Sequence, residues 1–382
     1  MLIERLSIGM IGTRGVPAAY GGFETAVEEI GARLVESGHR VVVYSRQQGG
    51  PHEYRGMEVR YLPTLRTKYT DTLVHGALST AHAALHGLDV GLVFNAANAP
   101  AALLLRARGI PYALNVDGLE WRRSKWSGAG KRYYLMSERL AVRTATRLVA
   151  DSRGISDYYR ERYGRSPVFI PYGAPAPSRE ALVRLEELGL QTRGYHLVVA
   201  RFEPENNVDL IVKGFAESSA SMPLVVVGGG PYSADYTASV HAAAAEDERI
   251  RFVGSVWDQE LLDALYVGAL TYVHGHSVGG TNPSLLRAAG GDANCLVYDV
   301  SFNREVADDD ASYFSSAAEV AAGVEASEAD VGAARGRGEA LGERVRRLYD
   351  WGDVAHRYEH LCRDLVLRTA EDTEGAAAPV AQ

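Results

Sequence analysis

The sequence has little cysteine and no long apolar run. Its 382 residues contain two cysteines, Cys295 and Cys362. Two such residues provide neither a disulfide framework nor the ligand spacing of a metal site, so we expect both to be small buried side chains in a reducing cytoplasm. No stretch of 18 apolar residues occurs, and the first residues lack the apolar segment and cleavage site of a signal peptide. The sequence therefore predicts a chain that is neither exported nor membrane-spanning.

An excess of positive charge is also missing. The formal net charge is −8, whereas general nucleic-acid binding needs a broadly basic surface. We therefore expect no nucleic-acid partner. Hydrophobic residues make up 46% of the chain, which is enough to build the cores of two domains of ordinary size.

Short apolar runs that read as strands alternate with helical patterns along most of the chain. Such alternation predicts α/β domains with parallel, doubly wound sheets. The expected strands cover residues 6–11, 40–44, 90–94, 112–116, 147–150 and 168–170 in the first half, and 196–200, 224–227, 250–253, 270–273 and 295–298 in the second.

The pattern is interrupted by a charged connector at about residues 175–194, which marks a domain boundary. We predict a first domain over 1–185 and a second over 186–348. An amphipathic helix over 349–368 follows, and the small, polar tail 369–382 is predicted to be disordered.

A glycine-rich junction follows the strand at 270–273. In it, Asn282 is a good N-cap residue and Pro283 suits the first position of a helix. The backbone N–H groups of Ser284 and Leu285, with Gly280 beside them, are then free to face an anion in front of the helix. We predict a diphosphate-binding site here.

A second glycine-rich junction, residues 12–22, connects the strand at 6–11 to a helix. Gly21 and Gly22 lack a Cβ atom and so permit close approach of the backbone to the same phosphates, although a tight turn at the helix entrance is an alternative. Two such junctions far apart in the sequence suggest one ligand held between two domains.

Five motifs in order along the chain carry a family resemblance. They are IGTRG at 11–15, YGGFET at 20–25, DGLEW at 117–121, RFEPENN at 201–207 and HGHSVGGTNPSLL at 274–286. With them the chain resembles the bacterial GT-B glycosyltransferases of family 4, above all the rhamnosyltransferase-like branch. The resemblance implies two facing Rossmann-like domains and a C-terminal helix that crosses back to the first. It implies that 1–185 is the acceptor side and that 186–348 binds a nucleotide-sugar. It also implies sugar transfer with retention and without a metal or other cofactor.

The resemblance and the chemistry of anions together assign Arg201 to the donor diphosphate and to catalysis. A guanidinium can clamp phosphate oxygens, although a surface ion pair with Glu203 or Glu205 is the alternative. Asn206 stands where the family usually has a lysine, so it can donate a hydrogen bond but adds no charge. Thr281 and Asn282 are expected to donate side-chain hydrogen bonds to the phosphates or, for Asn282, to cap the helix only.

Arg287 departs from the family pattern. The family places two glutamates eight positions apart and uses the second for the ribose; here those positions are Gly279 and Arg287. An arginine only donates hydrogen bonds and cannot replace a carboxylate acceptor. Arg287 is expected to reach a donor phosphate, to pair with Glu305, or to mark a chain with altered or lost activity.

The remaining site residues are assigned to the sugar and to the acceptor. His276 and the loop residues Asn303, Arg304 and Glu305 are candidates for the donor sugar or nucleoside. Asp117 follows a strand, where functional groups of parallel sheets gather, and is expected to orient the acceptor hydroxyl or to cap a loop. Arg14 is a candidate cation for the acceptor or a phosphate.

Residues 121–143 reverse the charge of this acidic chain. The acceptor or membrane side is assigned to Trp121, Arg122, Arg123, Lys125 and Trp126. Basic and aromatic residues of this kind suit an anionic membrane surface or a lipid-diphosphate-linked acceptor, and an ordinary solvated helix face is the alternative.

The preferred interpretation is a cytoplasmic glycosyltransferase at the inner face of the plasma membrane, which moves L-rhamnose from dTDP-rhamnose to a glycan or lipid-linked glycan. Two rivals remain. A catalytically silent homologue, or one that couples something other than a sugar, is suggested by Asn206 and Arg287. An NADP-dependent oxidoreductase is suggested by Gly9, Gly12, Gly15 and Arg46, but the glycine spacing does not match its fingerprint.

Overall fold

The computed structural model describes residues 5–18, 22–64, 71–116, 118–123, 126, 128–230, 234–244 and 246–377. The chain divides into two compact units. Unit 1 contains Met1–Tyr172 together with Trp351–Gln382, and unit 2 contains Gly173–Asp350. Each unit is described by itself.

Unit 1 is built on an eight-stranded sheet with the order β3-β4-β2-β1-β5-β6-β7-β8. Its strands pair in parallel except for the short β3–β4 hairpin. The strands are β1 (Ser7–Ile11), β2 (Arg40–Ser45), β3 (Glu53–Tyr54), β4 (Met57–Tyr61), β5 (Val90–Phe94), β6 (Tyr112–Val116), β7 (Arg147–Ala150) and β8 (Val168–Phe169).

Side chains of these strands point alternately to the two faces of the sheet and pack into two hydrophobic cores, as expected for a sheet covered on both faces. Helices α1 (Gly22–Glu36) and α13 (Trp351–Ala377) pack over one core, which includes Met10 and Val43. The other core, with Tyr44 and Leu114, lies under four helices. These are α2 (Asp71–Leu85), α3 (Ala99–Ala107), α4 (Gly128–Thr144) and α5 (Arg153–Tyr163), with the short turns η1 (Ala96–Asn98) and η2 (Glu120–Arg122) between them.

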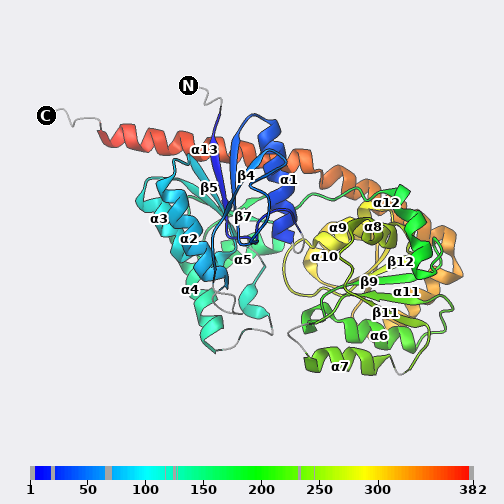
Figure 1. Ribbon diagram of the computed structural model, residues 1–382. Coiled ribbons are helices and arrows are strands. Elements are labelled where there is room, and N and C mark those ends of the chain that lie inside the picture. The colour runs from blue at the N-terminus through cyan, green and yellow to red at the C-terminus, as the bar shows by residue number, and fades with distance from the viewer. Residues whose placement is uncertain are drawn as a thin grey trace. The chain divides into compact units, whose positions relative to one another are not determined.

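The C-terminal helix α13 belongs to unit 1 although the chain enters it from unit 2. It packs against α1 through Val354, Tyr358 and Leu361 (Figure 1). The helix ends at Ala377, so residues 369–377 are helical where the sequence predicts a disordered tail. Residues 378–382 lie outside the described residues.

Unit 2 has a six-stranded, wholly parallel sheet with the order β11-β10-β9-β12-β13-β14. Its strands are β9 (His196–Val199), β10 (Leu224–Val227), β11 (Ile250–Gly254), β12 (Thr271–His274), β13 (Asn294–Tyr298) and β14 (Ser312–Phe314). Its helices are α6 (Val208–Ala216), α7 (Ala234–Ala243), α8 (Gln259–Gly268), α9 (Pro283–Gly290), α10 (Ser301–Ala307), α11 (Ala317–Ala329) and α12 (Val331–Leu348), with the 3₁₀ segments η3 (Arg179–Leu188), η4 (Pro204–Asn206) and η5 (Asp308–Asp310).

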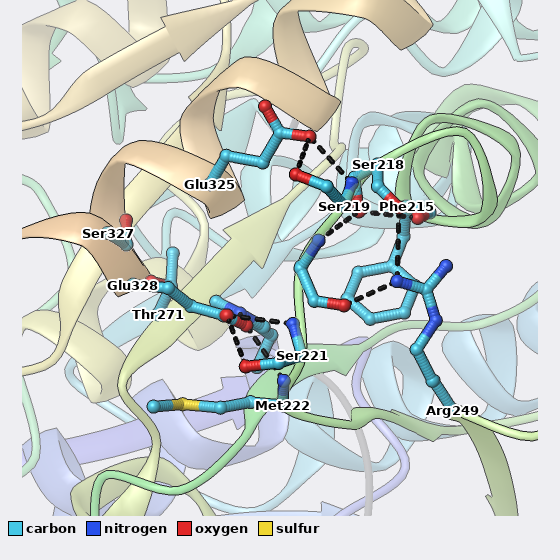
Figure 2. A network of polar contacts seen from close by, with 12 residues as sticks. Phe215, Ser218, Ser219, Ser221, Met222, Arg249, Thr271, Glu325, Ser327 and Glu328 are labelled. Carbon is cyan, nitrogen blue, oxygen red and sulfur yellow. Dashed lines mark hydrogen bonds and ion pairs between the residues drawn. The ribbon is translucent and has the colours of Figure 1, made fainter.

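A polar network fastens the loop between α6 and β10 to helix α11 (Figure 2). The Glu328 carboxylate accepts hydrogen bonds from the backbone N–H groups of Ser221 and Met222 at 2.7 and 2.9 Å. The same carboxylate lies 3.1 Å from Nε2 of the buried His196 at the start of β9. One turn earlier, Glu325 accepts from the backbone and the hydroxyl of Ser219.

The expected doubly wound α/β organisation with a returning C-terminal helix is confirmed. The strand order reverses between β1 and β5 in unit 1 and between β9 and β12 in unit 2. Ligands of open parallel sheets bind beyond the carboxyl ends of the strands at such reversals. Among the described helices, none is long and apolar enough to cross a lipid bilayer.

Candidate active site

In unit 2, the reversal of strand order brings together the loops that follow β9 and β12. The Asn207 amide donates a hydrogen bond to the Gly275 carbonyl at 2.7 Å, and the Ser277 N–H donates to the Glu205 carbonyl at 2.8 Å. Gly275 is required for this contact, because a Cβ atom there would lie 2.2 Å from the Asn206 carbonyl oxygen. The two loops therefore form one fastened unit at the carboxyl edge of the sheet.

Helix α9 begins at this edge as the sequence predicts. Pro283 is its first residue, and the Asn282 side chain accepts hydrogen bonds from the N–H of Ser284 at 2.9 Å and from the Ser284 hydroxyl at 2.7 Å. Asn282 is thus a true N-cap, and it engages the Ser284 N–H that we expected to be free. Thr281, Gly280 and Leu285 are buried beside this cap.

Behind the start of α9 lies a buried polar cluster that the sequence analysis did not identify. The Tyr272 hydroxyl lies 3.0 Å from Ser284 Oγ and 3.1 Å from His274 Nδ1. Burial lowers the pKa of His274 to about 3 and raises the pKa of Tyr272, so both are neutral. His274 Nε2 is buried without a hydrogen-bond partner in the part of the chain that the structure describes.

The side chain of Asn206 connects the two loops through His276. Asn206 Nδ2 donates to the Arg201 carbonyl at 2.8 Å, which leaves Oδ1 to accept from His276 Nδ1 at 2.7 Å. A histidine that donates through Nδ1 keeps a lone pair on Nε2. Both the nitrogen and the oxygen of the Asn206 amide therefore have protein partners, and the side-chain partner is His276. The spacing of 70 positions between the two residues gave no sequence signal of this pair.

Asn303 lies beneath His276. It is buried and donates through Nδ2 to the carbonyls of His276 and Tyr298, both at 2.9 Å, whereas its Oδ1 is buried without a hydrogen-bond partner among the described atoms. Its neighbour Arg304 is paired with Asp299 and stacks on the Tyr313 ring at 4.1 Å. Glu305 is half-buried. Of these three residues, Asn303 is the one with a hydrogen bond to His276.

Arg201 follows the end of β9. Its side chain is 37% exposed, and Nη1 lies 3.4 Å from Glu203 Oε1. The surface ion pair that we considered as an alternative is therefore present. The Glu203 side chain is 19% exposed, and the 3.4 Å separation is long for a charge-assisted hydrogen bond.

Arg287 is paired with a residue that the sequence analysis did not consider. Its Nε and Nη2 lie 2.8 and 2.5 Å from Asp263 Oδ1, and Nη1 lies 2.9 Å from Gln259 Oε1, both on α8. The predicted pairing with Glu305 is wrong, because α9 turns this arginine toward α8. Its guanidinium also lies 5.6 Å from the ring of Tyr266.

In unit 1, the loop after β1 is fastened to β2 and α1. The Arg14 N–H donates to Glu24 Oε1 at 3.0 Å, and its carbonyl accepts from Ser45 Oγ and from the Arg46 N–H, both at 3.2 Å. Gly22 is the first residue of α1. Three predicted site residues, Gly21, Asp117 and Lys125, lie outside the described residues.

The predicted basic and aromatic patch divides into two groups. The Trp121 ring has three cations within cation–π distance, at 5.2 Å for Arg122, 5.2 Å for Lys131 and 5.8 Å for Arg162. Arg123 and Trp126 instead turn to the buried Glu120, with Arg123 Nε 2.7 Å and Trp126 Nε1 3.3 Å from its carboxylate oxygens.

Among the described residues, no three His, Cys, Asp or Glu side chains form a metal-binding group.

Comparison with protein families decides the class of this chain. Residues 21–173 match the glycosyl transferase 4-like domain, and residues 186–328 match the glycosyl transferases group 1. The chain belongs to the group 1, GT4-like glycosyltransferases. Its two parallel sheets and returning helix form the GT-B fold, as the sequence resemblance implies.

Solved structures with this fold are similar over almost the whole length of this glycosyltransferase. Sucrose-phosphate synthase from Thermosynechococcus elongatus superposes with a TM-score of 0.79 at 20% identity, covering 95% of this chain and 100% of the other. Anabaena HepE in complex with UDP-glucose gives a TM-score of 0.78 at 13% identity, covering 94% and 100%. The α,α-trehalose-phosphate synthase from Burkholderia vietnamiensis gives 0.69 at 11%, covering 94% and 100%. No curated protein matches the sequence.

Proposed function

We propose that this glycosyltransferase transfers a sugar, with retention and without a metal, from a nucleotide-sugar to a glycan or lipid-linked glycan. L-Rhamnose from dTDP-rhamnose is the donor we favour, on the family resemblance. The observation that carries the proposal is the set of polar groups at the β9–β12 edge. A capped helix start, the His276–Asn206 pair and the buried side chain of Asn303 meet there.

The donor diphosphate is assigned to the start of α9. The positive end of a helix dipole favours an anion, and the buried backbone around Gly280, Thr281 and Leu285 excludes competing water. Arg201 supplies the mobile positive charge, since charge-assisted hydrogen bonds to phosphate are stronger than its exposed contact with Glu203. As the leaving diphosphate gains charge, these groups stabilise it. Gly21 and Gly22 are proposed to approach the same phosphates.

The donor sugar is assigned to His276. Because Asn206 accepts the Nδ1–H, the Nε2 of the neutral ring carries a lone pair, and we propose that it faces a sugar hydroxyl as an acceptor. The buried Asn303 supports the backbone of His276 by donating to its carbonyl. Asn206 acts through His276 as a positioning residue.

The nucleotide favoured by the resemblance is compatible with Arg287. In place of a carboxylate that accepts from ribose hydroxyls, this position carries a guanidinium already bound to Asp263. Deoxyribose has one hydroxyl fewer to satisfy than ribose, so this site suits a thymidine diphosphate. HepE structures with UDP and UDP-glucose support a nucleotide-sugar donor of the same general chemistry.

The acceptor is assigned to unit 1. We propose that Asp117, which follows β6 in the sequence, orients the acceptor hydroxyl, and that Arg14, in the loop after β1, provides a cation for the acceptor or a phosphate. A lipid-linked acceptor is compatible with work at the cytoplasmic face of a membrane.

A thermal-shift screen of dTDP, UDP, GDP and ADP tests the proposal. A ligand that binds only the folded chain stabilises it by about 2.7 kcal/mol at a hundred times its Kd. We expect dTDP to raise the Tm most and dTDP-rhamnose to be hydrolysed slowly in the absence of acceptor. If none of the four nucleotides raises the Tm, the donor assignment is wrong.

A silent homologue is the second candidate, and the engagement of Arg287 with Asp263 is the observation that favours it. The same panel separates the two. Nucleotide binding by the parent chain without hydrolysis or transfer of any donor would support the silent homologue.

A further inference from the structure

Helices α2, α3 and α4 lie side by side in unit 1 and present an unusual outer surface (Figure 1). Their inner faces bury Ala83, Ala102, Leu105 and Ala141 against the sheet. Their outer faces carry five of the eleven large apolar side chains that are exposed in the described chain. These five are Leu78 and Leu85 on α2, Leu103 and Leu104 on α3, and Met136 on α4, with Leu85 64% and Met136 50% exposed.

Helix α4 adds a row of exposed arginines to this apolar surface. Arg132, Met136, Arg139 and Arg143 are spaced by four, three and four residues, which places them on one side of the helix, and all four are exposed. In the part of the chain that the structure describes, none of the three arginines has an ion-pair partner.

Exposed arginines on other helices of the chain often have ion-pair partners. On α12, by contrast, Arg335 pairs with Glu339 at 2.7 Å and Arg346 with Asp292 at 2.8 Å. The one acidic residue of α4, Glu138, is buried and accepts the hydroxyls of Tyr158 and Tyr163 at 3.0 Å each. It therefore does not neutralise the outer face.

The charge is concentrated in this part of the sequence. Residues 91–150 contain ten lysines and arginines against three acidic residues, a net charge of +7. The whole chain has a net charge of −8, so the remainder carries −15. A basic region with exposed leucines in an otherwise acidic protein is a localised feature that solubility does not explain.

We propose that the α2–α4 face, formed by Leu78, Leu85, Leu103, Leu104, Met136, Arg132, Arg139 and Arg143, docks on an anionic lipid bilayer. The apolar side chains enter the boundary between headgroups and acyl chains, and the arginines bind the lipid phosphates, each contributing about 1 kcal/mol near an anionic surface. This face differs from the membrane side predicted from the sequence, which was assigned to residues 121–126. In that segment, Arg123 and Trp126 contact the Glu120 carboxylate.

A second copy of the chain is a poorer occupant. In a two-fold symmetric dimer the same surface meets itself, so the arginines of one face would meet the arginines of the other. Within the described parts of α2, α3 and α4 the acidic residues are Asp71 and Glu138, and both are already engaged, Asp71 with Arg46. The face offers no negative charge to receive the partner's arginines.

Docking through this face gives unit 1 a position at the membrane. That this position serves a lipid-linked acceptor rests on the proposed function. Lipid binding depends only on the residues of the α2–α4 face, so lipid binding and sugar transfer are measured separately.

Co-sedimentation of the full chain with vesicles tests the proposal. We expect binding to vesicles containing about one third phosphatidylglycerol, no binding to pure phosphatidylcholine, and loss of binding at high salt. The triple variant Arg132→Gln/Arg139→Gln/Arg143→Gln is expected to bind roughly 100-fold more weakly, from about 1 kcal/mol per arginine. Leu103→Ser/Leu104→Ser is expected to weaken binding at least tenfold, since it removes the inserted apolar area.

The control variant Lys213→Gln/Arg335→Gln/Arg347→Gln removes the same charge from exposed positions of unit 2 and is expected to bind as the parent does. Equal binding of the two triple variants, or no preference of the parent chain for anionic vesicles, overturns the proposal. So does a concentration-dependent dimer, seen by light scattering, that the α4 variant dissociates. The Tm shift with dTDP, measured on the same preparations, reports on the donor site independently, so either assignment can fail alone.

Discussion

The guanidinium of Arg287 lies against the carboxylate of Asp263, with Nε and Nη2 2.8 and 2.5 Å from the same Oδ1. Both side chains are largely buried, at 17% and 21% exposure. The pair ties α9, at whose start we propose the donor diphosphate binds, to α8. Position 287, where the family pattern has a ligand-binding glutamate, thus carries an arginine that joins two helices.

Replacing Arg287 by glutamate is expected to destabilise the protein. Two carboxylates would then face each other in a largely buried position, and the loss of a partner from such a pair costs on the order of 3 kcal/mol. Urea unfolding measures the change. The exchanged variant Arg287→Glu/Asp263→Arg is expected to recover most of the lost stability. An unaltered midpoint in the single variant would contradict the structural role.

Asn206 is expected to control the rate of transfer through His276. Asn206→Leu removes the acceptor that holds His276 Nδ1–H, so the ring loses its preferred tautomer, and we expect kcat/KM to fall at least tenfold. Asn206→Asp keeps an acceptor facing Nδ1 and adds a negative charge. It is expected to retain more activity than Asn206→Leu and to move the acid limb of the pH profile upward, because a carboxylate favours the imidazolium. Identical pH profiles for the parent and Asn206→Asp would rule out this coupling.

Buried His274 is expected to make the protein less stable in acid. Its pKa in the folded chain is about 3, below the ordinary value of 6.5. The unfolded chain therefore binds a proton below pH 6.5 that the folded chain does not. Its effect on stability is absent above pH 6.5 and grows as the pH falls toward 3, by up to about 1.4 kcal/mol per pH unit. Unfolding of His274→Gln between pH 3 and 7 is expected to show a flatter dependence, and an equal slope would contradict the assignment.

Glu328 is expected to stabilise unit 2 above its ordinary pKa (Figure 2). Burial alone would raise its pKa, but hydrogen bonds from the Ser221 and Met222 amides and from His196 lower it below 4.5. A lowered pKa means that the contribution is present above pH 4.5 and is lost as the pH falls below that value. Glu328→Gln is expected to cost about 2 kcal/mol at neutral pH. Glu325→Gln, on the exposed side of the network, is the matched control and is expected to cost less than half as much.

The features that local chemistry determines were predictable from the sequence. The alternation of apolar runs indicated two parallel sheets, and Asn282 with Pro283 indicated the start of α9, which the structure confirms. The tail was predicted less well, because a docked helix such as α13 can propagate beyond its last buried turn into residues of moderate helix propensity.

Contacts between distant segments were not predictable. Arg287 and Asp263 are 24 positions apart, and Asn206 and His276 are 70 positions apart. No periodicity or motif relates residues at such separations, since the strand order alone brings them together. The cluster of Tyr272 and His274 escaped notice for the same reason, because its partner Ser284 lies on the following helix.

The affinity for dTDP of the parent chain and of Arg201→Gln, measured by calorimetry, tests the central claim most directly. The account predicts binding by the parent and at least a tenfold loss in Arg201→Gln, since a charge-assisted bond to phosphate contributes about 1.5 to 3 kcal/mol. Arg251→Gln, which removes an exposed arginine from β11, is expected to bind dTDP as the parent does. Equal affinities for Arg201→Gln and Arg251→Gln, or no binding of dTDP by the parent, would contradict the assignment of a donor diphosphate to this edge of unit 2.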